Sequence, residues 1–396
     1  MNSWFTRVSG AVVLIVTVCL VIITGSALAD GDRDTGPAEV AKIGFFYVGG
    51  REFSYEGRTN IVDQTYVEFF IPAKVTSRYP IVMFHGNFQT GTVYLGTPDG
   101  REGWAEYFLR RGYPVYVVDQ VARGRSPYNP AADGPLENVT TDMMEHRYAA
   151  VEKVDHYPQA HLHTQWPGTG EPGDPSFDQL RMSQSPSLIS DSLVIDSMNR
   201  ADGVALLKRI GPAILLTHSR SGDFGWEIAD DAPSLVKGIV SVEPWGPPFY
   251  RAIVEHLDQI FEVSPPKIAR GLVAARYALT VDHLTYDPPV NDMSDLAPVR
   301  EEKAQAPDLV RCWFPTKPHR LPHLIGIPEA IISGEASFHV AFDHCTSQFL
   351  TQMGVSNDLV LLGDHGIHGN THMMMIEKNN LQIADLIADW IDKHVK

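Results

Sequence analysis

The chain has 396 residues, of which 44% are hydrophobic and 20% charged, so it can bury a full core and disorder is not expected. Its formal net charge of −16 at pH 7 repels phosphate backbones and argues against a nucleic-acid partner. The length fits either one large domain or two.

The N-terminus has the three parts of an export signal. Arg7 precedes an apolar run at residues 11–23, and Ala27-Leu28-Ala29 comes just before a polar stretch that begins at Asp30. We predict that residues 1–29 are a signal peptide cleaved after Ala29, and that the mature protein is secreted or periplasmic without stable membrane insertion. The alternative is an uncleaved anchor, although the apolar run is shorter than the ~20 residues that span a bilayer.

The remaining chain alternates apolar runs with stretches long enough for helices. Eight segments are predicted strands: residues 43–48, 66–71, 81–84, 115–118, 213–216, 238–242, 330–332 and 359–362. The last six are short, continuously apolar runs, which is typical of buried parallel strands. Near the C-terminus, Ile383, Leu386, Ile387, Trp390 and Ile391 have the spacing of one helical face. We therefore predict an α/β fold with a mostly parallel central sheet flanked by helices.

Two stretches are too long to be simple connections within this sheet. Residues 134–190 are rich in Pro, Gly and His, and residues 249–322 form the second stretch. Insertions of this size in an α/β core usually cover the site, so we predict one cap built from both within a single domain of residues 30–396. Trp166, Trp245 and Trp313 suggest that this cap offers apolar contacts.

A predicted strand leads directly into a serine-containing turn at residues 214–222, ILLTHSRSG. A nucleophile elbow requires small residues two positions before and after the serine, because the turn between strand and helix is tight. Ser219 meets this requirement through Thr217 and Ser221. If Ser221 were the nucleophile, Asp223 would occupy one of the small positions, where it fits poorly. We therefore predict Ser219 as the catalytic nucleophile.

An earlier strand ends in a His-Gly turn, at His85 and Gly86, that can complete an oxyanion hole. In such a site one backbone N–H comes from this loop and the other from the residue after the nucleophile. We predict Asn87 and Arg220 as the two donors, with Phe88 as the alternative to Asn87. His85 itself is interpreted as a residue that stabilises the turn.

Several long strings, in order along the chain, resemble one known family. They are HGNFQTG, PDGREGWAEYFLRRGYPVYVVDQVARGRS, HTQWPGTG, ILLTHSRSG, IVSVEP and HGNTHMMM. Together they are similar to the atypical secreted bacterial serine esterases of the α/β-hydrolase superfamily, a group with fungal relatives, and they extend over about residues 43–390. The resemblance implies an α/β-hydrolase fold and ester hydrolysis. Where the better-studied bacterial esterase has adjacent cysteines in the oxyanion loop, this chain has Asn87 and Phe88.

The predicted catalytic acid is unconventional. Most α/β hydrolases carry it after the seventh strand, but here that position holds Ser337, which cannot serve. Glu243 follows the strand next to the nucleophile strand, at the carboxyl edge of the sheet, where its side chain can reach a catalytic histidine. The resemblance also implies Glu243. Glu335 and Asp343 remain the alternatives.

Three histidines follow the last predicted strand: His365, His368 and His372. A catalytic histidine must reach the serine through one ring nitrogen and the acid through the other. We predict His372 as the general base, because the three methionines after it can fix the imidazole and because it matches the family's histidine. His365 and His368 are interpreted as loop residues that form hydrogen bonds.

The predicted function is a serine carboxylic ester hydrolase that acts through an acyl-enzyme on a small to medium, apolar ester and needs no cofactor or metal. A lactone or other acyl hydrolase of the same fold is the nearest alternative. A metal-dependent hydrolase, suggested by His156, His161 and His163, lacks a fixed-spacing motif such as HExxH. A haloalkane dehalogenase would carry an aspartate at Ser219, and a non-catalytic binding protein would have a broken triad.

Two further properties stay open from the sequence. Cys312 and Cys345 remain after signal cleavage, and they are equally compatible with one disulfide and with two separate buried thiols. The oligomeric state is not determined by the sequence, and a homodimer is compatible with it.

Overall fold

The computed structural model describes residues 36–188, 192–249, 252–253, 261–262 and 275–396. The predicted signal peptide and parts of both predicted insertions lie outside these residues. Within the described part of the chain, no helix combines the length and the apolar character that a membrane span requires.

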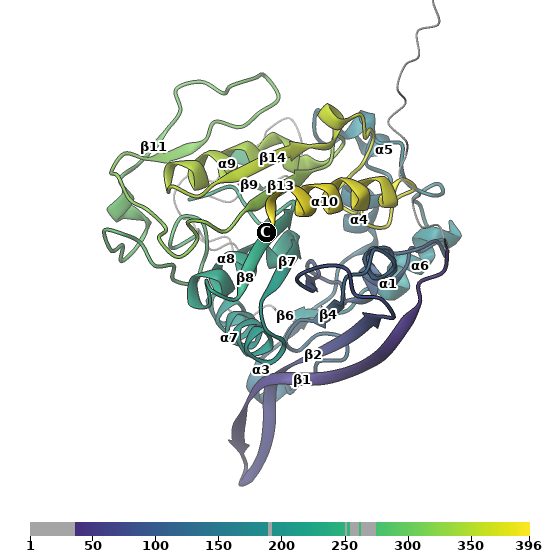
Figure 1. Cartoon of the computed structure of the whole chain (residues 1–396). Coiled ribbons are helices and arrows are strands. Elements are labelled where there is room, and N and C mark those ends of the chain that lie inside the picture. The colour runs from purple at the N-terminus through teal and green to yellow at the C-terminus, as the bar shows by residue number, and fades with distance from the viewer. Residues whose placement is uncertain (1–35, 189–191, 250–251, 254–260, 263–274) are drawn as a thin grey trace, which may run out of the picture. The chain divides into compact units, whose positions relative to one another are not determined.

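An eight-stranded sheet forms the centre of the fold, in the order β1-β2-β4-β3-β7-β8-β13-β14 (Figure 1). The six strands from β4 to β14 are parallel, whereas β2 runs antiparallel to both of its neighbours. The bounds are β1 Val40–Tyr55, β2 Arg58–Pro72, β3 Ile81–Phe84, β4 Val115–Asp119, β7 Ala213–His218, β8 Val236–Val242, β13 Glu329–Ser333 and β14 Asn357–Leu361. This confirms the predicted α/β fold and a strand at each of the eight predicted segments.

The parallel strands are apolar throughout because both faces of the sheet are covered. In β3, Ile81 and Met83 face one hydrophobic cluster, whereas Val82 and Phe84 face the other. Alternate residues of a strand point to opposite faces, so a strand buried on both sides needs apolar residues at every position. All four side chains of β3 are buried.

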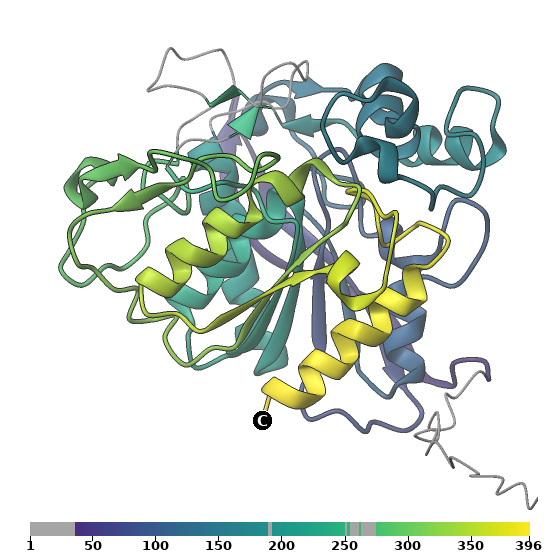
Figure 2. The same ribbon diagram turned by 90° about the horizontal axis from the view of Figure 1, so that it is seen from above.

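Helices cover each face of the sheet (Figure 2). The first cluster contains residues of α1 (Thr92–Leu95), α2 (Trp104–Arg110) and α10 (Asn380–His394). The second contains residues of α7 (Ser192–Ile210), α8 (Gly222–Asp231) and α9 (Asp343–Gln352). Helix α10 buries Ile383, Ile387, Trp390 and Ile391, which confirms the predicted C-terminal helix and its apolar face.

The β1–β2 hairpin is longer than the sequence suggested. Its pairing continues to Tyr55 and Arg58, whereas β2 pairs with β4 only between Tyr66 and Phe70. The outer part of the hairpin therefore extends beyond the sheet (Figure 1). Most of its side chains are exposed, so the apolar alternation that marks a buried strand is missing there.

The segment between β4 and α7 is folded and contains the first predicted insertion. Its elements are α3 Pro130–Asp133, β5 Leu136–Glu137, α4 Thr141–Met144, a π-helix Glu145–Ala149, α5 Val151–Val154, a 3-10 helix Ala160–Leu162, α6 Pro175–Ser183 and β6 Ser187–Leu188. Strands β5 and β6 pair antiparallel near the two ends of the insertion. The ends of this long excursion are thereby held together.

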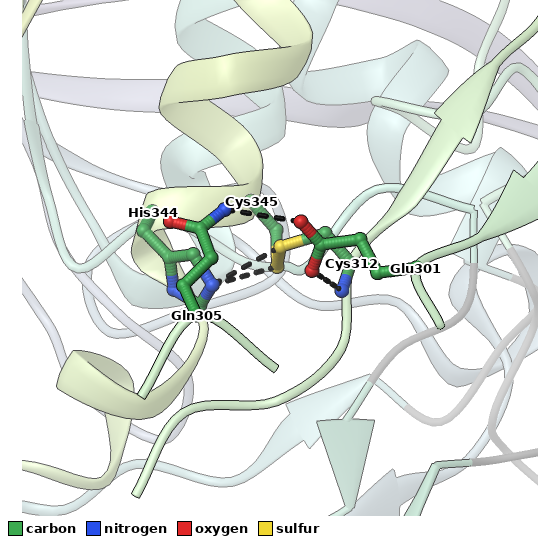
Figure 3. Close-up of a disulfide and its surroundings, with 5 residues drawn as sticks. All are labelled: Glu301, Gln305, Cys312, His344 and Cys345. Carbon is green, nitrogen blue, oxygen red and sulfur yellow. Dashed lines mark hydrogen bonds between the residues drawn. A yellow bond between two sulfur atoms is a disulfide. The ribbon is translucent and has the colours of Figure 1, made fainter. Parts of the chain in front are cut away.

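The second insertion is tied to helix α9. Its described elements are β9 Ala252–Ile253, β10 Phe261–Glu262, a 3-10 helix Met293–Leu296, β11 Pro298–Arg300 and β12 Trp313–Pro315. Cys312, just before β12, forms a disulfide with Cys345 in the first turn of α9 (Figure 3). Nε2 of His344 lies 3.1 Å from the Cys312 sulfur, and Glu301 accepts a hydrogen bond from the Cys312 backbone at 2.9 Å. Of the two cysteine arrangements left open by the sequence, the structure has the disulfide.

Candidate active site

Strand β7 ends at His218, and the chain then turns sharply into α8. Ser219, at this turn, has a φ of 54°, in the left-handed region that non-glycine residues rarely adopt. A strained turn of this kind between strand and helix is the mark of a nucleophile elbow. The residue is 9% exposed.

Close packing around the turn explains two small residues of the motif. A Cβ on Gly86 would lie 3.1 Å from Ser219 Cβ and 2.8 Å from Nδ1 of His218. A Cβ on Gly222 would lie 2.5 Å from Cβ of Pro244, at the end of β8. The glycine of the His-Gly loop is therefore needed to bring that loop against the serine.

Ser221, the alternative nucleophile, is fully enclosed. Its hydroxyl lies 2.9 Å from the carbonyl oxygens of Phe84 and His218 and accepts from the His218 N–H at 2.8 Å. It has no exposed surface, whereas Ser219 does. The hydroxyl of Ser221 thus stabilises the turn.

The predicted oxyanion donors come from the His-Gly loop, which packs against Ser219, and from the residue after Ser219. Phe88 is not free to act, because its N–H donates to Ser187 Oγ at 2.9 Å. Asn87 is half-buried, and its backbone N–H makes no hydrogen bond to the described part of the chain. The Arg220 side chain turns away into a buried ion pair with Asp196, which fixes the backbone of the residue after the serine.

His85 stabilises the His-Gly loop that carries Asn87. Its Nδ1 lies 2.8 Å from the carbonyl oxygen of Gly86, and its Nε2 accepts the N–H of Gln120 at 3.1 Å. Burial, followed by the nearby Arg123 cation, lowers the pKa of His85 to about 3. The ring is therefore neutral and can hold these two contacts at physiological pH.

Glu243 is completely buried at the end of β8 and is surrounded by donors. One oxygen accepts the Gly334 N–H at 2.8 Å, and the other accepts the Ser337 hydroxyl at 2.7 Å. The second oxygen also lies 2.5 Å from Nδ1 of His372. Burial raises the pKa of Glu243, while the donors from Gly334 and Ser337 favour its ionised form.

His372 is buried between aromatic and imidazole rings. Its ring centre lies 4.5 Å from that of His218, 5.7 Å from Tyr148 and 4.8 Å from His339. Burial, then the charges of His339 and Arg147, lower the pKa of His372 well below 6.5. The ring is thus neutral and can accept a proton. Among the described residues Ser219 makes no hydrogen bond to His372, and such bonds often tighten only when substrate binds.

The alternative acids contact other histidines. Glu335 lies 2.9 Å from Nδ1 of His368, and Asp343 lies 3.1 Å from Nδ1 of His339. His365 is exposed in the 3-10 helix Leu362–His365. Of the candidates that the sequence offered, the structure brings Glu243 and His372 into direct contact, next to the Ser219 turn.

Sequence reasoning missed the residues that support this contact. His339 stacks on His372, and Ser337, noted only as an absent aspartate, donates to Glu243. The spacing of His339 and Asp343, four residues apart, was the available signal for the first. Glu377 accepts hydrogen bonds from Thr371, the residue before His372, and no local pattern predicts that contact.

The first insertion also reaches the His372 loop. His163 lies 2.6 Å from Glu152, within the insertion, and 3.1 Å from Glu377. Burial opposes a charge on His163, but the two carboxylates outweigh it and raise its pKa to about 9. Oγ1 of Thr371 also lies 2.9 Å from the carbonyl oxygen of Tyr148. These bonds attach the insertion to the residue that precedes His372.

Three groups of described side chains could hold a metal ion by geometry. They are Cys312, His344 and Cys345; Glu243, His339 and His372; and Asp196, Asp223 and Glu227. The first is oxidised to a disulfide, the second is joined by its own hydrogen bonds, and the third lies beside the Arg220 guanidinium. None of the three includes His156, His161 or His163, the residues behind the metal-dependent alternative.

The sheet order, the strained serine turn and the buried histidine–glutamate contact define an α/β-hydrolase fold with its candidate site at the carboxyl ends of the parallel strands. The chain is 41% identical over 382 residues, covering 96% of this chain and 97% of the relative, to "probable secreted lipase phiG" of Fungal sp. (strain ATCC 74256). It therefore belongs to the same α/β-hydrolase family of ester-hydrolysing enzymes.

A solved structure described as a novel bacterial esterase supports this assignment. It has 26% identity and a TM-score of 0.62, with 91% of this chain and 98% of that chain covered. No protein-family model matches the chain. The resemblance drawn from the sequence to secreted bacterial esterases with fungal relatives is thereby confirmed at the level of family.

Proposed function

We propose that this protein is a serine carboxylic ester hydrolase that works through an acyl-enzyme, with Ser219 as nucleophile, His372 as general base and Glu243 as acid. The observation that carries the proposal is the 2.5 Å contact between Nδ1 of His372 and a fully buried Glu243, beside a serine held at a φ of 54°. A neutral histidine oriented by a carboxylate is the arrangement that activates a serine.

The proposed steps follow from these groups. Nε2 of His372 takes the hydroxyl proton as Ser219 Oγ attacks the acyl carbonyl carbon. Glu243 holds Nδ1 and stabilises the imidazolium, while the backbone N–H groups of Asn87 and Arg220 donate to the oxyanion. The imidazolium then protonates the departing alcohol. Water, deprotonated by His372, then attacks the acyl-enzyme, and the imidazolium returns its proton to the departing Ser219 Oγ, which releases the acid and restores the serine.

We propose a small to medium, apolar ester as substrate, with a lactone as the nearest alternative. The name lipase belongs to the fungal relative, and it favours an ester with an apolar acyl part. Of the three tryptophans that suggested apolar contact, Trp245 donates its backbone N–H to the Ser219 carbonyl at 2.9 Å. Trp166 is instead buried against Phe177 in the interior of the first insertion.

We further propose that the two insertions form a cap and that the mature protein is exported. Contacts of the first insertion with the His372 loop, through Tyr148 and His163, favour a covering role. The word "secreted" in the fungal relative's name favours export. N-terminal sequencing of the native protein tests the second proposal, because cleavage after Ala29 leaves Asp30 as the first residue.

The proposed nucleophile is tested with Ser219→Ala and its matched neighbour Ser221→Ala. On a panel of p-nitrophenyl esters and lactones, Ser219→Ala should lose about 10⁶-fold in kcat, by analogy with triad serines. A serine-directed phosphonate should label wild type and Ser221→Ala, and mass spectrometry should place the adduct on Ser219. Activity of Ser219→Ala within tenfold of wild type, or an adduct on another residue, would contradict the assignment.

A further inference from the structure

A second histidine–carboxylate pair lies directly behind the proposed triad. His339 belongs to the 3-10 helix Phe338–Ala341, and Asp343 begins α9. Nδ1 of His339 lies 3.1 Å from one oxygen of Asp343, whose other oxygen accepts the Ser333 hydroxyl at 2.5 Å. Both side chains are buried, at 5% and 0% exposure. The mechanism described above makes no use of this pair.

The imidazole of His339 stacks on the imidazole of His372. The rings of His339 and His372 are stacked, with centres 4.8 Å apart and planes inclined by 8°. Ser337 joins the two pairs, because its hydroxyl donates to Glu243 and accepts the His339 backbone N–H at 3.2 Å. Two imidazoles and two carboxylates are thus held together in the interior.

Electrostatics decides which imidazole carries a proton. Burial opposes a charge on His339, but Asp343 and then Glu243 outweigh it, and the pKa of His339 is raised. Burial lowers the pKa of His372, and the charge of His339 is the next cause. Two buried carboxylates need a nearby cation, and the proton on His339 supplies one without protonating the base.

The titratable and charged groups that face this assembly come from several elements. Around His372 they are Glu243 on β8, His218 on β7, His339, and Arg147 and Tyr148 of the first insertion. Around His339 they are Asp343, Glu243 and His372. His218 is itself buried with a strongly lowered pKa, so it adds no charge of its own.

We propose that His339 and Asp343 act as positioning residues for the reaction: they hold a positive charge against the face of His372 and so keep the base unprotonated in mildly acidic solution. This inference rests on the proposed function. The same charge makes the His372 imidazolium a stronger acid, which favours proton transfer to the departing alcohol. A purely structural pair would leave the protonation of His372 unchanged.

The test is the pH dependence of kcat/KM for p-nitrophenyl acetate, which reports the pKa of the base in the free enzyme. His339→Asn keeps a donor near Asp343 but removes the cation. We expect the midpoint of the acidic limb to rise by about one pH unit, with about tenfold lower kcat/KM below both midpoints. On the alkaline plateau, kcat/KM for this ester should stay within about threefold of wild type, because His372 is unprotonated in both proteins and p-nitrophenolate leaves without needing a proton.

Asp343→Asn gives the sharper result, because two models predict shifts of the acidic midpoint in opposite directions. If His339 carries its proton because of Asp343, the variant loses both charges, the cation nearest to His372 disappears, and the midpoint rises. If His339 is already neutral, the variant removes only a negative charge, and the midpoint falls. The double variant, with both His339→Asn and Asp343→Asn, should shift the midpoint by less than the sum of the two single shifts, since both changes act through the proton on His339.

His368→Asn is the matched control, because it removes an exposed histidine from the loop that carries His372. Its midpoint should equal that of wild type. His339→Gln replaces the asparagine variant if that chain fails to fold, and thermal unfolding checks each protein. A uniform loss of rate with an unmoved midpoint overturns the inference, and so does a downward shift in Asp343→Asn. If Ser219→Ala retains wild-type activity, the proposed function itself fails.

Discussion

The ends of β8 and β13 lie side by side in the sheet, yet they contribute different chemistry. The end of β8 carries a carboxylate, Glu243, and the loop after β13 carries the groups that hold it, the Gly334 N–H and the Ser337 hydroxyl. In most proteins of this fold the acid would come from that loop. The loop after β13 therefore keeps its position beside Glu243 while it offers hydrogen-bond donors in place of a carboxylate.

Of the changes that distinguish the end of β8 from the loop after β13, replacing the proposed acid should have the largest effect. Glu243→Gln should lower kcat at neutral pH by about 10⁴-fold, because an amide can neither enforce the required histidine tautomer nor stabilise the imidazolium. Steady-state kinetics on one p-nitrophenyl ester at one pH measures this. On the alkaline plateau, Asp343→Asn should stay within about threefold of wild type. If Asp343→Asn lost as much activity as Glu243→Gln, the catalytic acid would have to be reassigned to Asp343, at the start of α9.

How far the sequence predicts this region depends on the range of the signal. The sequence signals for β8 and Glu243 are local, because a buried parallel strand must be apolar and its carboxyl end must lie at the site. The signal for Ser219 is also local, since a tight turn restricts the residues on either side of it. His339 and Tyr148 approach His372 from segments far away in the chain, and no periodic pattern encodes such a contact. The outer β1–β2 hairpin was missed because its exposed residues carry no apolar alternation.

The next effect should appear in stability rather than in rate. The disulfide joins the second insertion to the first turn of α9, two residues after Asp343, across a sequence separation of 33. Replacing both cysteines by alanine should cost about 2–4 kcal/mol of unfolding free energy, because the unfolded chain regains its freedom. Urea unfolding measures this cost.

The same double-alanine variant tests whether the disulfide also affects the proposed active site. The disulfide does not touch Glu243 or His372, so kcat/KM at pH 8 should stay within about threefold of wild type while the protein is folded. Wild type in a thiol reductant is the matched comparison. A rate loss greater than tenfold in the folded variant would mean that the position of α9 controls the triad directly.

A smaller effect is expected from the donor in the loop after β13. Ser337→Ala removes one of the contacts of Glu243 at 2.7 Å and should lower kcat by about tenfold, the usual worth of a hydrogen bond to a charged group. Ser337→Thr keeps a hydroxyl and should restore most of the rate. If threonine fails to restore activity while both variants are equally stable, the hydroxyl is not the contributing group.

The smallest effect should come from Glu335, which lies on the same loop but contacts His368 rather than His372. Its carboxylate contacts His368, which is 63% exposed, and accepts the Gly369 N–H at 2.9 Å. Exposed ion pairs contribute about 0–1 kcal/mol, so Glu335→Gln should change kcat less than threefold and stability only slightly. Kinetics on the ester used for Glu243→Gln, together with thermal unfolding, measures both. Glu335 and Glu243 are the same residue type, so a large loss in Glu335→Gln would show that the loop after β13 supplies the acid after all. If Glu335→Gln is neutral while Glu243→Gln loses most of its activity, the catalytic carboxylate is Glu243 at the end of β8. The loop after β13 then contributes only the hydrogen bonds that Gly334 and Ser337 donate to it.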